Sequence, residues 1–177
     1  LQDWEKKLEA CRKVESPLVE WTPHLPRPVR ARRQQDYLVR SSLPQGRETR
    51  SSRSVMTALW MSANTVRAVS RTVMPRISWW LPPVIWPDES ALWQRLIVEA
   101  LRGGATHFVC NAPWQAGLFP LEDEKRRPHL TAGPFCNVSN PAAVAVLAQM
   151  GFEAAFASPE LSGADYMALP RRCLLPM

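Results

Sequence analysis

Residues 130–169 constrain the fold more than any other part of this sequence. Asn140 and Pro141 place a helix N-cap directly before a proline that suits the first helical position, and Gly151 lies where helices commonly end. Apolar runs of strand length lie on either side of this expected helix, at 131–136 and 152–157. A strand, a helix and a second strand in so short a stretch predict a crossover between neighbouring parallel strands.

The same alternation of apolar runs and helical segments extends in both directions. Helices are expected at 63–74, at 164–169 and, with Asp88 as N-cap, at 89–102. Further strands are expected at 55–61, 77–81, 106–110 and 173–175. A closed (β/α) barrel needs eight strands and about 250 residues. Six strand candidates in 177 residues therefore predict an α/β fold, a partial (β/α) TIM-type barrel with parallel strands.

The first 53 residues differ in composition from the rest. The first 14 have the apolar spacing of an amphipathic helix. Prolines and serine pairs follow, which predicts an extended arm with one short strand at 37–39. We therefore expect an N-terminal helix and a basic, proline-rich arm over residues 1–53, and the partial barrel over residues 54–177.

Positive charge is concentrated in one segment of the chain. Between positions 27 and 76 there are eleven arginines and only two acidic residues. Such a segment can bind RNA through phosphate contacts, or it can be a solvated linker, and the scarcity of aromatic side chains favours the linker. If the segment binds nucleic acid, the expected contact residues are Arg30, Arg32, Arg33, Arg50 and Arg53.

Two turns in the constraining stretch carry a family resemblance. The first is Asn137-Val138-Ser139-Asn140, and the second is Ser158-Pro159-Glu160-Leu161. Together they resemble the N-x-x-N and S-P-E-L turns of the collagenase-like peptidase family U-32, in the C-terminal part of its catalytic region. The resemblance implies a (β/α) barrel and a peptidase, hence a hydrolase. Other members resemble oxygen-independent hydroxylation proteins that act on RNA bases or on a quinone precursor.

Polar residues at the ends of the expected strands are the candidate site. In parallel α/β folds, ligands and chemistry collect at the carboxyl ends of the strands. The resemblance adds weight to Asn137 and Glu160, and we expect these two and Ser158 to be catalytic. Ser158 and Glu160 also suit the cap and first turn of a following helix. Expected substrate-binding residues are Asn111, Asn140 and Trp114.

The sequence contains no catalytic motif that would independently support a peptidase. Neither a G-x-S-x-G elbow nor an H-E-x-x-H motif is present, and His24, His107 and His129 are not paired with an evident nucleophile. Trp114 lies in the long connection after the 106–110 strand, which is either a binding loop or a decorated surface loop. The reaction and the substrate, a peptide or an RNA, are therefore left open.

The four cysteines predict free thiols and no metal site. Their spacing contains no C-x-x-C pair, which excludes the usual zinc and dithiol motifs. Some members of the resembled family bind an iron–sulfur cluster, through cysteines downstream of the S-P-E-L turn. We therefore expect no cofactor in this chain, and a cluster only in a longer parent protein.

The remaining expectations concern surroundings and partners. No window approaches twenty apolar residues and no signal peptide is visible, so we expect a cytoplasmic protein without a membrane anchor. The chain begins without Met, which indicates a piece of something longer. A partial barrel has open strand edges, and we expect the arm, a second copy of the chain or parent domains to cover them.

Overall fold

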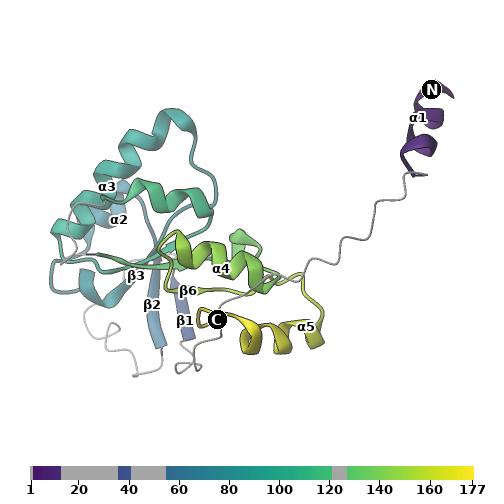
Figure 1. The fold of residues 1–177 in the computed structure, drawn as a ribbon. Helices are drawn as coiled ribbons and strands as arrows, with labels where there is room; N and C mark the ends of the chain where they lie inside the picture. The colour runs from purple at the N-terminus through teal and green to yellow at the C-terminus, as the bar shows by residue number, and fades with distance from the viewer. Residues whose placement is uncertain (1, 13–35, 41–54, 121–126) are drawn as a thin grey trace.

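The computed structural model describes residues 2–12, 36–40, 55–120 and 127–177 (Figure 1). Its centre is a six-stranded sheet in which every strand pair is parallel. The spatial order of the strands equals their order in the sequence. The strands are β1 (Asp36–Arg40), β2 (Val55–Trp60), β3 (Ile77–Trp80), β4 (His107–Cys110), β5 (His129–Ala132) and β6 (Ala154–Ala155). The expected α/β class and parallel strands are confirmed.

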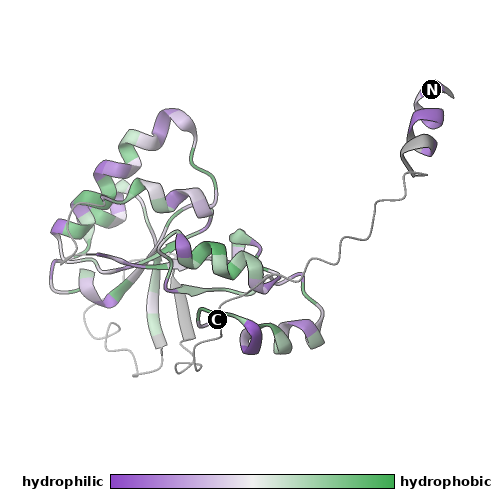
Figure 2. Ribbon diagram, in the orientation of Figure 1, coloured by the Kyte–Doolittle hydropathy of each residue, from purple (hydrophilic) through white to green (hydrophobic). Residues whose placement is uncertain are grey.

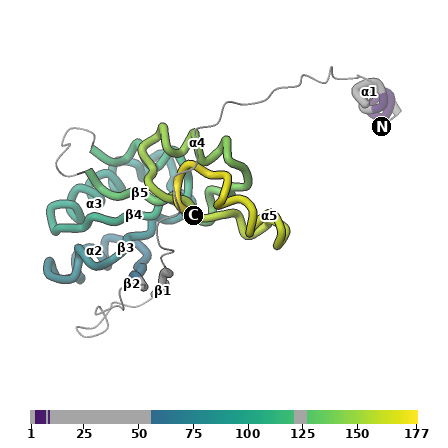
Figure 3. The backbone as a smooth tube through the Cα atoms, turned by 60° about the horizontal axis from the view of Figure 1, so that its bottom comes forward, coloured from purple at the N-terminus to yellow at the C-terminus, as the bar shows by residue number. Residues whose placement is uncertain are grey.

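Helices lie between the successive strands from β2 to β6. The α-helices are α1 (Gln2–Arg12), α2 (Ala63–Ala68), α3 (Ser90–Arg102), α4 (Pro141–Gln149) and α5 (Gly163–Ala168). The described residues also form the 3-10 helices η2 (Met74–Arg76), η3 (Pro87–Glu89), η4 (Pro113–Leu118), η6 (Pro134–Cys136) and η7 (Leu169–Arg172). The tube in Figure 3 shows α2 and α3 alongside β3 and β4. None of the helices in the described ranges is long and apolar enough to cross a bilayer.

The two faces of the sheet contribute to different apolar clusters. Successive side chains of a strand point to opposite faces, so Trp79 and Trp80 diverge. Trp79 belongs to the main core with Leu59, Phe108 and residues from α2, α3 and α4. Trp80 packs with Ala58 and Val109 in a smaller cluster, where its ring makes edge contacts with Trp60 and Phe156. Burial on both faces is typical of parallel sheets.

The helix α4 forms as its sequence predicts. The Asn140 side chain accepts a hydrogen bond from the Ala143 N–H at 2.8 Å, and Pro141 occupies the first helical turn. Gly151 follows the helix with a φ of 93°, which favours glycine. Figure 2 colours α4 hydrophobic along most of its length, and Val144 and Leu147 are buried in the core. The capping residues and the buried residues therefore both favour a helix at this position.

Several expected boundaries are wrong, mostly because prolines end or begin elements. The strand expected at 131–136 lies at β5, since Pro134 begins η6 instead. The strand expected at 152–157 reduces to β6 and one isolated bridge between Val138 and Ala157. Residues 173–175 form no strand, although the Pro176 carbonyl accepts a hydrogen bond from the Ala155 N–H at 3.0 Å.

Two expected helices also differ from the structure. Asp88 is no N-cap: it lies inside η3, and α3 begins after Glu89 without a side-chain cap. Pro87 starts η3 because its fixed φ suits a first helical turn. The helix expected at 63–74 ends at Ala68 and is capped by Ser62 and Thr65, whose side chains each accept a backbone N–H.

Replacing Asn140 by alanine should lower the free energy of unfolding by about 1 kcal/mol, because the N-cap acceptor of α4 is removed. Urea denaturation measures the change. Asn140→Asp is the matched control, since a carboxylate still accepts from the Ala143 N–H. Equal losses in the two variants would contradict the capping role.

Candidate functional site

The three expected catalytic residues lie together in the structure. Asn137 is in the loop after β5, whereas Ser158 and Glu160 are in the loop after β6. The Ser158 hydroxyl donates to the side-chain oxygen of Asn137. Nδ2 of Asn137 donates to Oε2 of Glu160 at 3.3 Å, and the Glu160 N–H donates to Oγ of Ser158 at 3.1 Å. We call these three residues the Asn–Ser–Glu cluster.

The backbone around the cluster fixes its position. Asn137 has φ 51° and ψ 47°, and it is the one non-glycine residue with positive φ in the part of the chain described. Asparagine tolerates this left-handed conformation better than most residues. The Ser158 N–H donates to the Val138 carbonyl at 2.8 Å beside the isolated bridge. The two loops are therefore joined through both backbone and side chains.

Within this network, the three side chains have different chemistry. Ser158 is buried, and its hydroxyl donates a hydrogen bond to the amide oxygen of Asn137, which is not a base. Activation of a serine nucleophile requires a base within hydrogen-bond reach. Asn137 and Glu160 are exposed, so their amide and carboxylate face solvent. In this arrangement Ser158 connects the loops, while Glu160 is the group able to exchange a proton.

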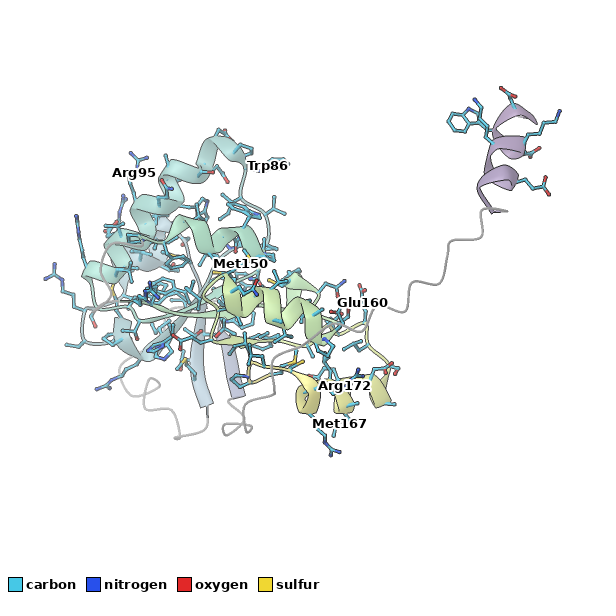
Figure 4. All side chains as sticks on the ribbon, viewed as in Figure 1. Trp86, Arg95, Met150, Glu160, Met167 and Arg172 are labelled. Atoms are coloured by element: carbon cyan, nitrogen blue, oxygen red, sulfur yellow. The ribbon has the colours of Figure 1, made fainter. Side chains whose placement is uncertain are left out.

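The helix-capping roles expected for Ser158 and Glu160 are wrong. Helix α5 is capped by Ser162, whose Oγ accepts from the Asp165 N–H at 3.2 Å and donates to its carboxylate at 2.7 Å. The chain turns at Pro159 and Glu160 before α5 begins. The side chain of Glu160 is therefore available to Asn137. Figure 4 shows Glu160 beyond the end of α4, away from Trp86.

Asn111 is part of a buried frame at the carboxyl ends of β3 and β4. Its Nδ2 donates to the Leu81 carbonyl at 2.7 Å, and its N–H donates to Oε1 of Gln115 at 2.8 Å. Nε2 of Gln115 donates to the Pro82 carbonyl at 2.7 Å. Both side chains are buried, and Oδ1 of Asn111 has no hydrogen-bond partner among the described residues. We call Asn111 and Gln115 the amide frame.

The amide frame and the Asn–Ser–Glu cluster lie at one edge of the sheet. The Cys110 carbonyl accepts from the Gly133 N–H at 2.7 Å and from the Cys136 thiol at 3.2 Å. The loop after β5 is thereby bound to the end of β4, one residue before Asn111. The candidate residues after β4, β5 and β6 therefore lie at the same edge of the sheet, although no hydrogen bond joins Asn111 to the cluster within the described ranges.

The other expected binding residues have mixed positions. Asn140 uses its side-chain oxygen as the cap of α4. Trp114 lies on η4 and is 48% exposed. The expected nucleic-acid contacts Arg30, Arg32, Arg33, Arg50 and Arg53 lie outside the residues that the structure describes. From the same basic segment Arg67, Arg71 and Arg76 are described, and all three are exposed.

Three residues of this edge were not identified from the sequence. Gln115 is wholly buried, and the signal for it is its position four residues after Asn111 in a turn that Pro113 begins. Trp86 and Phe135 are exposed by 64% and 60%. They follow β3 and β5, as Trp114 follows β4, so each of three consecutive strands is followed by a loop that presents an aromatic ring to solvent.

Cys110, Cys136 and Cys173 are free thiols in apolar surroundings. Burial raises the pKa of Cys136 to about 11, although a hydrogen bond from the Gly133 backbone opposes this shift. Burial also raises the pKa of Cys110, and the neighbouring Cys136 adds to the effect. Burial raises the pKa of Cys173, with Arg172 opposing it. Among the described residues no group of three or more potential ligands could hold a metal ion.

Replacing Gly133 by alanine should destabilise the fold by about 1–3 kcal/mol, because a Cβ there would overlap Oδ1 of Asn111 and lie 2.8 Å from a methyl of Val109. Thermal or urea unfolding measures the loss. Gly117→Ala is the control, since nothing lies within 4 Å of its added carbon. A Gly133→Ala protein as stable as the control would show that the amide frame can shift freely.

Alkylation of Cys136 by iodoacetamide at neutral pH should be roughly a hundredfold slower than that of an unhindered thiol, because the thiolate is the reactive form and a pKa of about 11 leaves little of it. Peptide mass spectrometry after timed labelling gives the rate. The rate should keep rising with pH well above the pKa of free glutathione, which serves as the control. A plateau near that of glutathione would disprove the raised pKa.

The chain was compared with known protein families, curated proteins and solved structures. No family model, no curated protein and no solved structure matches the chain. The candidate site therefore rests on the residues at the carboxyl edge of the sheet.

Proposed function

We propose that this chain is part of an enzyme of the collagenase-like U-32 peptidase type, with its active site at the carboxyl ends of the strands of a (β/α) barrel. The single observation that carries the proposal is the Asn–Ser–Glu cluster. It joins the two turns on which the family resemblance depends, although Asn137 and Glu160 are 23 positions apart in the sequence. Hydrogen bonds between these side chains hold the two turns together as one unit.

The strand order supports the barrel part of the proposal. A doubly wound sheet reverses its strand order at a switch point, whereas a (β/α) barrel adds each strand beside the previous one. Here all six strands follow the sequence order. Helices pack into the main core on one face, and Trp80 and Val109 form a separate cluster. This division supports the proposal, because a barrel wall also has a helix-covered outer face and a separately packed inner face.

Within the proposed site, Glu160 is the acid–base group. Its carboxylate is exposed and is oriented by Asn137 Nδ2, and its own backbone N–H is held by Ser158. A positioned carboxylate can take a proton from an attacking water or give one to a leaving group. Asn137 fixes the direction of the carboxylate, and Ser158 holds the Glu160 loop against the Asn137 loop.

A second candidate function is the oxygen-independent hydroxylation of an RNA base, and the exposed aromatic rings favour it. Trp86, Trp114 and Phe135 follow three consecutive strands at the same edge. Exposed aromatic rings can stack on nucleobases, which stabilises binding by about 1–3 kcal/mol per base. The two candidates share the location of the site and differ in substrate. The basic, proline-rich arm would also suit an RNA substrate, because its arginines could contact phosphates.

The variant Glu160→Gln in the protein expressed from its full gene should reduce activity on the order of a hundredfold or more, because the proton-transfer group is lost. Hydrolysis of labelled gelatin tests the peptidase, and mass spectrometry of RNA for an added oxygen tests the alternative. Asn137→Ala should lower activity with unchanged circular dichroism. Glu99→Gln on α3 is the matched control.

The outcomes of this experiment are distinct. Gelatin hydrolysis that Glu160→Gln abolishes supports the peptidase. Base hydroxylation abolished by the same variant supports the second candidate. Full activity of a protein carrying both Glu160→Gln and Asn137→Ala would remove the Asn–Ser–Glu cluster from the site.

A further inference from the structure

A second polar cluster lies at the opposite, amino-terminal edge of the sheet. His107 begins β4 and His129 begins β5, and the two are register partners. Their ring centroids are 4.9 Å apart, with ring planes inclined by 31°. Nδ1 of His129 lies 2.8 Å from Oε2 of Glu153, the residue before β6. With Thr106, whose hydroxyl is 2.8 Å from Nδ1 of His107, these residues form the histidine cluster.

The histidine cluster shares a face of the sheet with the smaller apolar cluster. His107 and Val109 are two positions apart on β4, so their side chains point the same way. The register partner of His107 on β3 is Ser78, which is buried and carries no charge. The only described compensating charge is therefore Glu153, which bonds to His129.

These contacts make the charge of the pair depend on pH. Two neutral rings can stack at this distance, but two imidazolium rings would repel each other, and one carboxylate can offset only one of them. Burial lowers the pKa of His107 below its ordinary value of 6.5, and His129 lowers it further, while Glu153 opposes the shift. The Thr106 hydroxyl can donate to neutral Nδ1 of His107, and protonation reverses that bond.

We propose that the histidine cluster is a pH-sensitive latch, which holds the amino-terminal ends of β4 and β5 together when His107 is neutral and loosens when His107 is protonated. The folded state takes up this proton less readily than the unfolded chain. The contribution of His107 to stability is therefore complete above about pH 6.5 and is lost as the pH falls below that value. The latch lies away from the proposed active site, so the two ideas stand independently.

Urea denaturation of the full chain at about pH 7.5 and about pH 5.5 tests the latch, because histidine titrates between these values. The midpoint should fall on acidification, and His107→Gln should reduce the fall. If His107→Gln loses as much stability as the unmodified chain, the latch is excluded.

A titration followed by nuclear magnetic resonance covers the case in which His107→Gln does not fold. The ring protons of His107 should titrate below the ordinary histidine pKa of 6.5. In His129→Gln the His107 titration should move to higher pH, since the neighbouring positive charge is removed. An unchanged His107 titration in that variant would overturn the proposed coupling.

Amide exchange gives the conformational readout. After correction for intrinsic rates, protection of Phe108 and Leu130 should fall at about pH 5.5 relative to about pH 7.5, while protection of Leu59 on β2 should change less. The same protection at both pH values in β4 and β5 would show that the rings titrate without loosening the strands, and would overturn the latch.

Discussion

The alternation of side chains along each strand is the constraint on which this structure depends. It separates two consecutive tryptophans, so that Trp79 packs among the helices and Trp80 packs against Trp60 and Phe156. A register slip of one residue would exchange these environments. Because the two faces pack different partners, a slip would remove both rings from the contacts that they make here. The parallel register in turn aligns the strand ends, and the strand ends carry the polar side chains.

The loops after the strands are fixed by hydrogen bonds that cross from one strand to the next. The amide frame joins the ends of β3 and β4, the Cys110 carbonyl accepts from the loop after β5, and the Asn–Ser–Glu cluster joins the loops after β5 and β6. The amide frame and the Cys136 thiol satisfy backbone carbonyls after β3 and β4, whereas the Asn–Ser–Glu cluster joins its loops through side chains. The edge is therefore one connected framework, which can hold exposed groups in defined positions.

The sequence predicts the parts of this framework that depend on local chemistry. Asn140, Pro141 and Gly151 act within one helix, and their roles were correct because capping and positive φ are local properties. Asp88 and Ser158 are equally good caps by type, yet proline turns beside them moved the helix starts to Ser90 and Gly163. The role of Gln115 depends on a carbonyl 33 residues away, and no local pattern contains that partner.

The distinction between framework and chemistry explains why Glu160 stands out. The buried side-chain amides of Asn111 and Gln115 form hydrogen bonds to backbone groups. The Ser158 hydroxyl donates to Asn137 and accepts from the Glu160 N–H. Glu160 accepts one described hydrogen bond, from Asn137, which adopts a sparsely populated conformation to give it. Such a conformation costs energy and persists where surrounding contacts fix it. The acid–base role that we propose for Glu160 requires such a constraint, because Asn137 can then hold one exposed carboxylate in a defined direction.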